Sequence, residues 1–325
     1  MQVFKRFWSA GAVALCALAI PLASAAQDFP NRAIRIVVPY PAGGQSDIFT
    51  RLIAESMKQQ FDKPVTVENR AGAGTTLGAN VVAKAPPDGY TILLAAASAT
   101  AITPLTIKST SFDPRQITPI TLVAKVPYIL VASKSFPPNT MAEFLAYAKA
   151  NPGKVNWATH GMGAAQHLTG EMFAQAAGIN ITPIHYQGSA PGLVDMLGGR
   201  VELMFDGAGT GLVSVRSGQL KAIGMGSDKR VSSVPDLPTW KEGGVPFSAY
   251  TWYGMFAPTG TPAPVMEKLH AAITTAINSK AYKERIALAE GDVPAMSIAE
   301  TRKFVTDDTA MWTALIPSLN LKLNE

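Results

Sequence analysis

One stretch decides how this chain folds: Pro39-Tyr40-Pro41-Ala42-Gly43-Gly44-Gln45-Ser46-Asp47. It follows the apolar run 34–38 and precedes apolar residues at helical spacing, namely Ile48, Leu52, Ile53, Met57 and Phe61. This order predicts a strand, a glycine turn and a helix whose first backbone N–H groups have no partner within the helix. The start of a helix carries partial positive charge, so the stretch predicts a site for a carboxylate or a phosphate.

The first 26 residues have the features of a secretory signal peptide. Lys5 and Arg6 supply a positive start, and residues 10–22 form an apolar run too short to span a bilayer comfortably. Small residues at 23–26 offer cleavage sites, so we expect residues 1–26 to be removed and the mature protein to be periplasmic. The one cysteine lies inside this segment. Without disulfides, the mature chain depends on a sizeable hydrophobic core.

The charge balance of the chain is mildly basic, with 28 Lys and Arg against 23 Asp and Glu and a net charge of +5. This bias suits acidic small molecules as partners. Basic residues occur in runs of two at most, so we expect no binding of nucleic acid. After the signal peptide, no apolar stretch is long enough to cross a membrane, which predicts a soluble mature protein.

Strand-like runs alternate with helical patterns along the mature chain. This alternation predicts mainly parallel sheets covered by helices. The number of expected strands favours two sheets and hence two lobes. The strands are expected at residues 34–38, 65–68, 90–95, 128–133, 155–158, 182–186, 201–205, 221–225 and 252–257. Thr140 and Ser297 are each followed by Glu three residues later, which predicts capped helix starts, and Pro262 opens a further helix.

Two proline-containing crossings predict where the lobes meet, near residues 125–127 and near residues 244–247. If these are hinges, lobe 1 contains residues 28–126 plus 249–325, and lobe 2 contains residues 127–248. The expected α/β architecture therefore has two crossover strands and a ligand cleft between the lobes. Proteins of this class place ligands beyond the carboxyl ends of their strands.

A second glycine turn repeats the pattern of the first in the other expected lobe. Residues 155–168 read as a strand, a Gly161-Met162-Gly163 turn and a helix. Two helix starts that face each other across a cleft can hold the two ends of a dicarboxylate, or several atoms of one carboxylate. The alternative is that both turns serve only the geometry of their connections.

Six motifs in order along the mature chain resemble one family. They are Pro39 to Asp47, Glu68-Asn69-Arg70-Ala71-Gly72-Ala73-Gly74, Pro87-Asp88-Gly89-Tyr90-Thr91, Tyr186-Gln187-Gly188-Ser189-Ala190-Pro191, Gly198-Gly199-Arg200-Val201-Glu202-Leu203-Met204-Phe205-Asp206 and Ala257-Pro258-Thr259-Gly260-Thr261-Pro262. The chain is similar to the Bug-type extracytoplasmic receptors, the solute-binding subunits of tripartite tricarboxylate transporters. The resemblance implies a type II periplasmic-binding-protein fold, a carboxylate closed between the lobes, and delivery to a membrane permease.

Carried over position by position, the resemblance implies a pocket with four parts. The residues are Tyr40, Ala42, Gly43, Gly44 and Asp47 of the first loop, Ala97, Ser98 and Thr100 after the third strand, Thr159, His160, Gly161 and Gly163 of the second loop, and Tyr186 and Asp206 of lobe 2. Because like charges repel, we expect Asp47 to fix the turn or the helix start. Asp206 is expected to meet an ammonium group, a hydroxyl group or water.

The four histidines of the chain have different expected roles. His160 stands where the family often has a small residue, and it either contacts a ligand carboxylate or ring or is merely solvated. His167 is expected to be structural, whereas His185 and His270 carry no functional signal. The aromatic group 250–253 is expected to pack in the core and hinge, with one ring as a possible wall of the pocket.

Other function classes have weaker support in the sequence. A hydrolase would need a nucleophile or zinc motif, and the chain has neither Gly-x-Ser-x-Gly nor His-Glu-x-x-His. Residues 71–78 invite a dinucleotide interpretation, but their glycines are better explained by close packing of a helix on the sheet. We therefore expect no cofactor, no metal and no catalysis. The alternative that the receptor signals to a membrane kinase stays open, and so does the identity of the ligand. A freely closing receptor is most simply a monomer.

Overall fold

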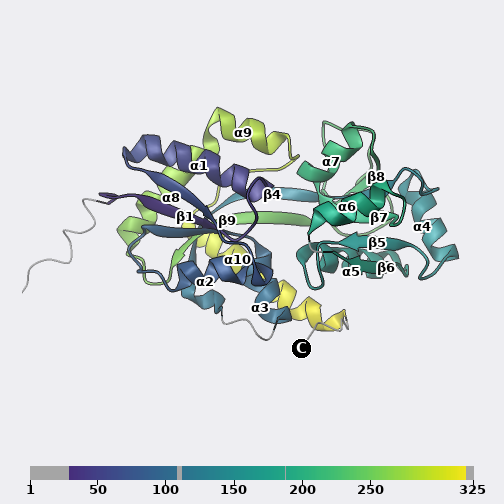
Figure 1. Cartoon of the computed structure of the whole chain (residues 1–325), viewed down its shortest axis with the longest axis horizontal. Helices are drawn as coiled ribbons and strands as arrows, with labels where there is room; N and C mark the ends of the chain where they lie inside the picture. The colour runs from purple at the N-terminus through teal and green to yellow at the C-terminus, as the bar shows by residue number, and fades with distance from the viewer. Residues whose placement is uncertain (1–28, 108–111, 187, 320–325) are drawn as a thin grey trace, which may run out of the picture.

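The strand that opens the fold is β1 (Ile34–Val38), which is buried except at Arg35. The structure, a computed structural model, describes residues 29–107, 112–186 and 188–319 in two lobes (Figure 1). The predicted signal peptide lies outside these residues. β1 pairs in parallel with β2 (Val65–Asn69) and β3 (Thr91–Ala95), and β9 (Tyr250–Pro258) is antiparallel to β3.

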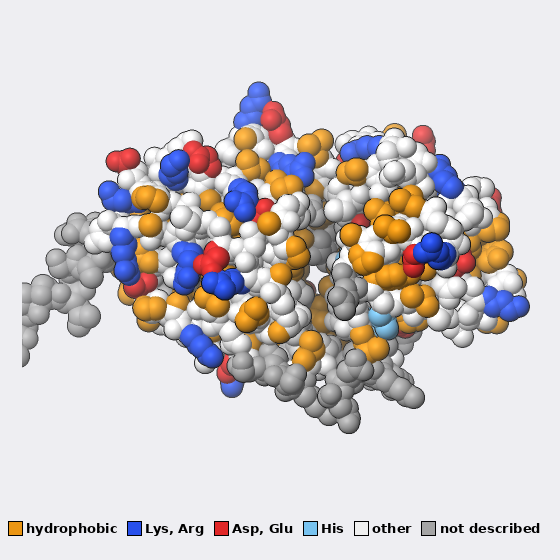
Figure 2. Space-filling model, in the orientation of Figure 1, with side chains coloured by type: hydrophobic (Ala, Val, Ile, Leu, Met, Phe, Trp, Pro, Cys, Tyr) orange, Lys and Arg blue, Asp and Glu red, His pale blue; other side chains and the backbone are white. Residues whose placement is uncertain are grey.

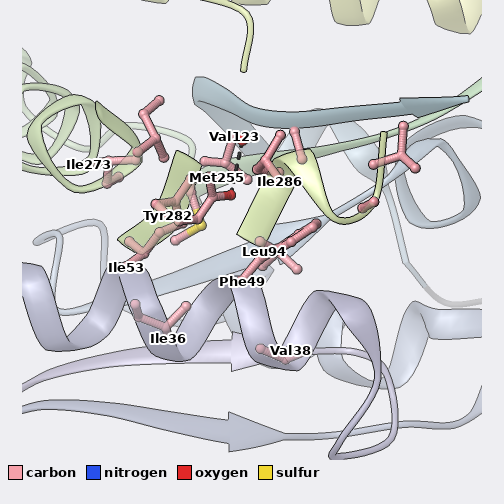
Figure 3. Close-up of a cluster of buried hydrophobic side chains, with 14 of the residues drawn as sticks. Ile36, Val38, Phe49, Ile53, Leu94, Val123, Met255, Ile273, Tyr282 and Ile286 are labelled. Carbon is pink, nitrogen blue, oxygen red and sulfur yellow. Dashed lines mark hydrogen bonds between the residues drawn. The ribbon is translucent and has the colours of Figure 1, made fainter. Parts of the chain in front are cut away.

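Helices cover both faces of this first sheet. Alternate residues of a strand point to opposite faces, so Ile36 and Val38 face one layer and Val37 the other. The first layer contains α1 (Gln45–Phe61), α8 (Ala263–Asn278) and α9 (Lys280–Ala287), whose apolar side chains meet β1 and β9 in Figure 3. The second contains α2 (Thr76–Ala83), α3 (Thr103–Thr106) and α10 (Ile298–Ser318).

The second lobe is built around the end of a long strand, β4 (Ile117–Ser133). Its last residues lie between the antiparallel strands β7 (Leu203–Gly207) and β8 (Leu220–Met225). The sheet continues from β7 through β5 (Asn156–Thr159) to β6 (Thr182–His185), both in parallel pairings. Its helices are α4 (Met141–Ala150), α5 (Ala165–Ala177), α6 (Ser189–Leu197) and α7 (Ala208–Arg216).

The topology corrects two predictions. Within the described ranges the nine strands form one continuous sheet through β4, and four of the eight strand pairings are antiparallel. The expectation of mainly parallel sheets is therefore wrong, and the two expected sheets share β4. The strand expected at 128–133 begins at Ile117, because Pro119 sits at a register shift and Pro127 lies where β4 changes its partner from β9 to β7 and β8.

Helix starts follow the predicted caps. The Ser297 hydroxyl accepts a hydrogen bond from the Glu300 N–H, and the Glu300 carboxylate accepts one from the Ser297 N–H, which completes a capping box. Thr140 caps α4 in the same way, although the Glu143 carboxylate reaches the Asn139 N–H instead. In the part of the chain that the structure describes, no helix is long and apolar enough to cross a membrane.

Candidate ligand-binding cleft

A cavity of about 1050 Å³, here called the cleft, lies between the two lobes. The space-filling view shows the molecule hollowed at this place (Figure 2). Lobe 1 contributes the loop after β1, the turn after β3, the first residues of β9 and one side of α10. Lobe 2 contributes the loop after β5, the end of β7 and the starts of α6 and α7. The cleft thus lies at the carboxyl ends of β1, β3, β5 and β7, as predicted for this architecture.

Four helices begin at the wall of the cleft. The first residues of α1, α5 and α6 line it, as do Gly207 and Thr210 at the start of α7. The N–H groups in the first turn of each helix lack acceptors within that helix, and the helix dipole adds partial positive charge. Lys125 is the one Lys or Arg among the described lining residues, and its ammonium lies 3.9 Å from the Tyr250 ring centre. Backbone amides therefore supply most of the attraction for an anion.

The first glycine loop is held by the carboxylate of Asp47. This side chain is only 4% exposed, and it accepts hydrogen bonds from the Gly43 N–H at 2.9 Å, the Asn69 amide at 3.0 Å and the Arg51 guanidinium at 2.9 Å. Burial opposes ionisation of Asp47, but these hydrogen bonds outweigh burial and lower its pKa. Gly43 has a φ of +81°, a conformation that favours glycine. Asp47 therefore fixes the turn, as predicted.

The second glycine loop is held by two histidines. The Nδ1 atom of His167 accepts a hydrogen bond from the Gly163 N–H at 3.0 Å. The hydroxyl of the fully buried Thr159 lies 2.8 Å from His185 Nδ1 and accepts a hydrogen bond from the Gly161 N–H at 3.2 Å. The structural role predicted for His167 is confirmed. His185, which carried no signal in the sequence, holds Thr159 in place.

These contacts correct one part of the predicted mechanism. The N–H groups of Gly43, Gly161 and Gly163 were expected to bind the ligand, but all three donate to side chains of the protein. The glycines are required for backbone shape, since Gly161 has a φ of +132°. The donors left for an anion are the N–H groups in the first turns of α1 and α5, which begin immediately after the two loops.

His160 and Asp206 face each other in the wall formed by lobe 2. The His160 Nε2 atom lies 3.7 Å from Asp206 Oδ1, and no described group makes a hydrogen bond to this buried nitrogen. Burial lowers the pKa of His160, and the nearby Asp206 carboxylate only partly offsets this effect. Asp206 is itself held by the Gly207 N–H at 2.8 Å and the Thr210 hydroxyl at 2.7 Å. The His160 side chain thus lines the cleft with a ring nitrogen that has no hydrogen-bond partner among the described residues.

The opposite wall contains a pair of hydroxyl groups. The Tyr40 hydroxyl lies 2.8 Å from the Ser98 hydroxyl, and the Tyr40 ring packs edge-on against Tyr253. Burial raises the pKa of Tyr40 to about 12, so its hydroxyl stays protonated. Tyr40 and Ser98 line the cleft, as do these other predicted site residues: Ala42, Gly43, Gly44, Ala97, His160, Gly161, Gly163 and Asp206.

Four predicted site residues do not line the cleft. Asp47 and Thr159 lie behind the loops that they support. Thr100 is buried and donates to the Ala96 carbonyl at 3.2 Å, and the Tyr186 hydroxyl donates to Asp195 at 2.8 Å. This geometry gives these side chains a supporting position rather than a contact with the cleft.

The sequence analysis missed one side of the cleft. Phe304, Asp308, Met311 and Trp312 of α10 line it, beside Trp252 of β9, which belongs to the aromatic group named as a possible wall. Burial raises the pKa of Asp308 to about 6, and the indole N–H groups of Trp252 and Trp312 face its carboxylate without reaching hydrogen-bond geometry. The spacing of these α10 residues, i, i+4, i+7 and i+8, marks one face of a helix and was the available signal.

No group of His, Cys, Asp and Glu among the described residues is arranged to hold a metal ion.

A two-lobed α/β fold with a cleft lined by helix starts defines the class of periplasmic solute-binding proteins. The family model described as tripartite tricarboxylate transporter family receptor matches residues 49–321. The chain therefore belongs to this receptor family, whose members are periplasmic solute receptors of the Bug type.

Individual relatives agree with this assignment. Protein BugT of Bordetella pertussis is 34% identical over 315 residues, which cover 96% of each chain. The structure of an R. palustris protein with adipate has a TM-score of 0.83 and 28% identity, over 90% of this chain and 98% of that one. MatC from Rhodopseudomonas palustris with bound malate has a TM-score of 0.79 and 30% identity, over 89% of this chain and all of that one.

Proposed function

We propose that this receptor captures a small organic carboxylate in the cleft and delivers it to the membrane permease of a tripartite transporter. The convergence of four helix starts on one cavity carries the proposal, because it supplies anion-binding groups on both lobes. Two related structures contain adipate and malate, which are small carboxylates. The signal peptide at residues 1–26 would bring the chain to the periplasm.

The proposed mechanism is a closure of the two lobes on the ligand. Lobe 1 would contain residues 28–126 plus 249–325, and lobe 2 residues 127–248. The change of strand partners along β4 between Pro127 and Tyr128 supports this division. A ligand that contacts helix starts on both lobes stabilises the closed state, because those contacts exist together only when the cleft is shut. Waters would adapt the cleft to carboxylates of different length.

The receptor would act by binding alone and as a monomer. Its family is one of receptors rather than enzymes, which supports release of the ligand chemically unchanged. The partners of this cycle are the carboxylate and the integral-membrane subunits of the permease.

A thermal-shift screen of the mature protein against mono-, di- and tricarboxylates, with neutral analogues, tests the proposal. A ligand at a hundred times its dissociation constant stabilises the fold by about 2.7 kcal/mol, which gives a clear rise in melting temperature. We expect a response to one class of carboxylate and none to its neutral amides. A shift with the neutral analogues alone would overturn the proposal. The absence of a shift with every carboxylate would overturn it as well.

Two variants then locate the site. Gly43→Val and Gly161→Val place a side chain on backbone with positive φ in the two loops, and we expect each to abolish the carboxylate response. Gly218→Val is the matched control, since Gly218 has a φ of +72° at the far end of α7, outside the cleft. It should strain the backbone equally but leave the ligand response intact. Loss of response in the control as well would assign the effect to folding.

A further inference from the structure

One part of the cleft is lined by apolar side chains that the binding of a carboxylate does not use. Its members, here called the apolar wall, are Met172 of α5, Trp252 of β9, and Phe304, Met311 and Trp312 of α10. The rings of Trp252 and Phe304 pack edge to face, with their centres 5.6 Å apart. Met172 packs against the buried cluster that contains Trp252 and Trp312. Both lobes therefore contribute to the wall.

Helix α5 connects the apolar wall to an anion-binding helix start. The side of α5 that lines the cleft carries Ala165, Gln166, Thr169 and Met172. Ala165 is the first residue of the helix, and Met172 follows about 10 Å further along the axis, at 1.5 Å per residue. Methionine side chains in helices lean back toward the helix start, which shortens this distance. The wall therefore begins within a few bonds of a carboxylate held at the start of α5.

Two methionines expose apolar surface to the cleft from opposite lobes. Met311 of α10 is 44% exposed, and Met162 of the second glycine loop is 41% exposed. Apolar surface of this kind gains free energy when an apolar group covers it and removes it from water. Methionine is also flexible and polarisable, so it adapts to apolar groups of different shape. This part of the cleft therefore suits a hydrocarbon group of the ligand.

The polar groups at the apolar wall disfavour a second charge on the ligand. Helix α10 lines the cleft from Phe304 onward, where backbone N–H groups are bonded within the helix. Asp308 lies in the same row, and its carboxylate would repel a second ligand carboxylate. The indole N–H groups of Trp252 and Trp312 already face that carboxylate, so an ammonium group is not required there. Either charge would also lose its water beside aromatic and thioether side chains, which costs free energy.

We propose that the apolar wall binds the uncharged hydrocarbon body of a monocarboxylate, aliphatic or aromatic, while the helix starts hold its carboxylate. The inference rests on the proposed function, because the carboxylate must first be held. It goes further by naming the class of acid that the receptor selects. Each methylene that the wall buries should strengthen binding about three- to fourfold.

Isothermal titration calorimetry of the mature protein with two matched sets of acids tests this inference. Butyrate, hexanoate and octanoate differ only in length, whereas hexanoate, adipate and 6-aminohexanoate share one chain length and differ only at the far end. We expect affinity to rise with length, and hexanoate to bind at least about tenfold more tightly than adipate and 6-aminohexanoate. Affinity that does not depend on length would overturn the inference. Adipate or 6-aminohexanoate binding as tightly as hexanoate would overturn it as well.

A variant of the wall locates the effect. In Met311→Ser, we expect the preference for octanoate over butyrate to fall at least about fivefold. Leu77→Ser is the matched control, since Leu77 is 50% exposed on α2 of the same lobe and does not line the cleft, and it should keep the preference. An equal loss of affinity for both acids in Met311→Ser would assign Met311 to closure and overturn the inference.

The two proposals fail in different ways. Binding of carboxylates of every length with equal affinity would remove this inference and leave the proposed function standing. A wild-type protein that binds no carboxylate would remove both.

Discussion

The Nδ1 atom of His167 accepts a hydrogen bond from the backbone N–H of Gly163, four residues earlier, at 3.0 Å. The carboxylate of Asp47 holds the N–H of Gly43 in the same way across the cleft, at 2.9 Å. Both acceptors are the third residue of their helix. An acid and an imidazole thus perform the same task in the two lobes.

Loss of the imidazole acceptor should weaken ligand binding through the loop of lobe 2. His167→Ala leaves the Gly163 N–H without its acceptor, so the loop loses the hydrogen bond that holds it. We expect the affinity for the best carboxylate of the panel to fall severalfold, as measured by calorimetry.

The control for this prediction is His167→Asn. The amide oxygen of asparagine also accepts a hydrogen bond. If the bond to Gly163 is the sensitive element, this variant keeps more of the affinity than His167→Ala. An equal loss in the two variants would assign the effect to the packing of the ring.

Gly209→Ala should oppose closure of the cleft. A Cβ at this position would lie 2.7 Å from the Gln45 amide nitrogen and 2.9 Å from the Ala289 Cβ, both on the other lobe. Close by, the Arg216 guanidinium pairs with the Glu290 carboxylate at 3.2 Å, so the lobes meet tightly here. We expect affinity to fall about tenfold, because overpacking costs about 1–3 kcal/mol and an open state avoids it.

Gly207→Ala is the matched control, since its Cβ would lie at an ordinary 3.7 Å from Gln45. Small-angle scattering with saturating ligand should give a larger radius for Gly209→Ala than for Gly207→Ala. Equal radii and equal affinities would show that this contact has no part in closure.

Asp308→Asn should stabilise the protein near neutral pH. Burial raises the pKa of Asp308 from 3.8 to about 6, so the folded state favours the protonated acid. Folding stability is therefore lost as pH rises from about 4 through 6, by roughly 1–2 kcal/mol after allowance for partial exposure. Asparagine resembles the neutral acid and removes this loss. Melting temperatures should exceed wild type at pH 7.5 and converge at pH 4; a constant difference would contradict the assignment.

Gly170→Ala should destabilise the fold although alanine favours helices. Gly170 lies in α5 against the fully buried Trp157, and an added Cβ would come within 2.3 Å of the indole. Overpacking of about 1–3 kcal/mol exceeds the gain of about 1 kcal/mol in helix propensity. Urea unfolding measures the difference, with the exposed Gln175→Ala in the same helix as the control. An increase in stability would mean that Trp157 moves freely.

Local patterns in the sequence predicted most elements but not their partners. The strand at 34–38 and its glycine turn were found because both are encoded within about a dozen residues. The first half of β4 was missed, since Pro119 and Pro127 resemble strand ends when their bulge and change of partner are not visible. Antiparallel pairing of β4 with β9 joins residues far apart in the chain, which no local pattern reports.

The candidate site was predictable to a similar degree. Both glycine loops and His160 were identified, and they line the cleft. The engagement of Gly163 by His167 had a signal that went unused, because the spacing repeats that of Gly43 and Asp47. The contribution of α10 depends on how a C-terminal helix packs beside a distant cleft. That arrangement is set by tertiary contacts rather than by neighbouring residues.

The reliance on helix starts has an evolutionary consequence. Every residue type except proline carries a backbone N–H, so most point mutations around the cleft leave its anion-binding capacity intact. Side chains such as His160 and Gln45 are then free to vary without loss of the basic affinity. A lineage can therefore change its nutrient by a few substitutions, and gene duplication followed by drift yields receptors for new acids from one unchanged scaffold.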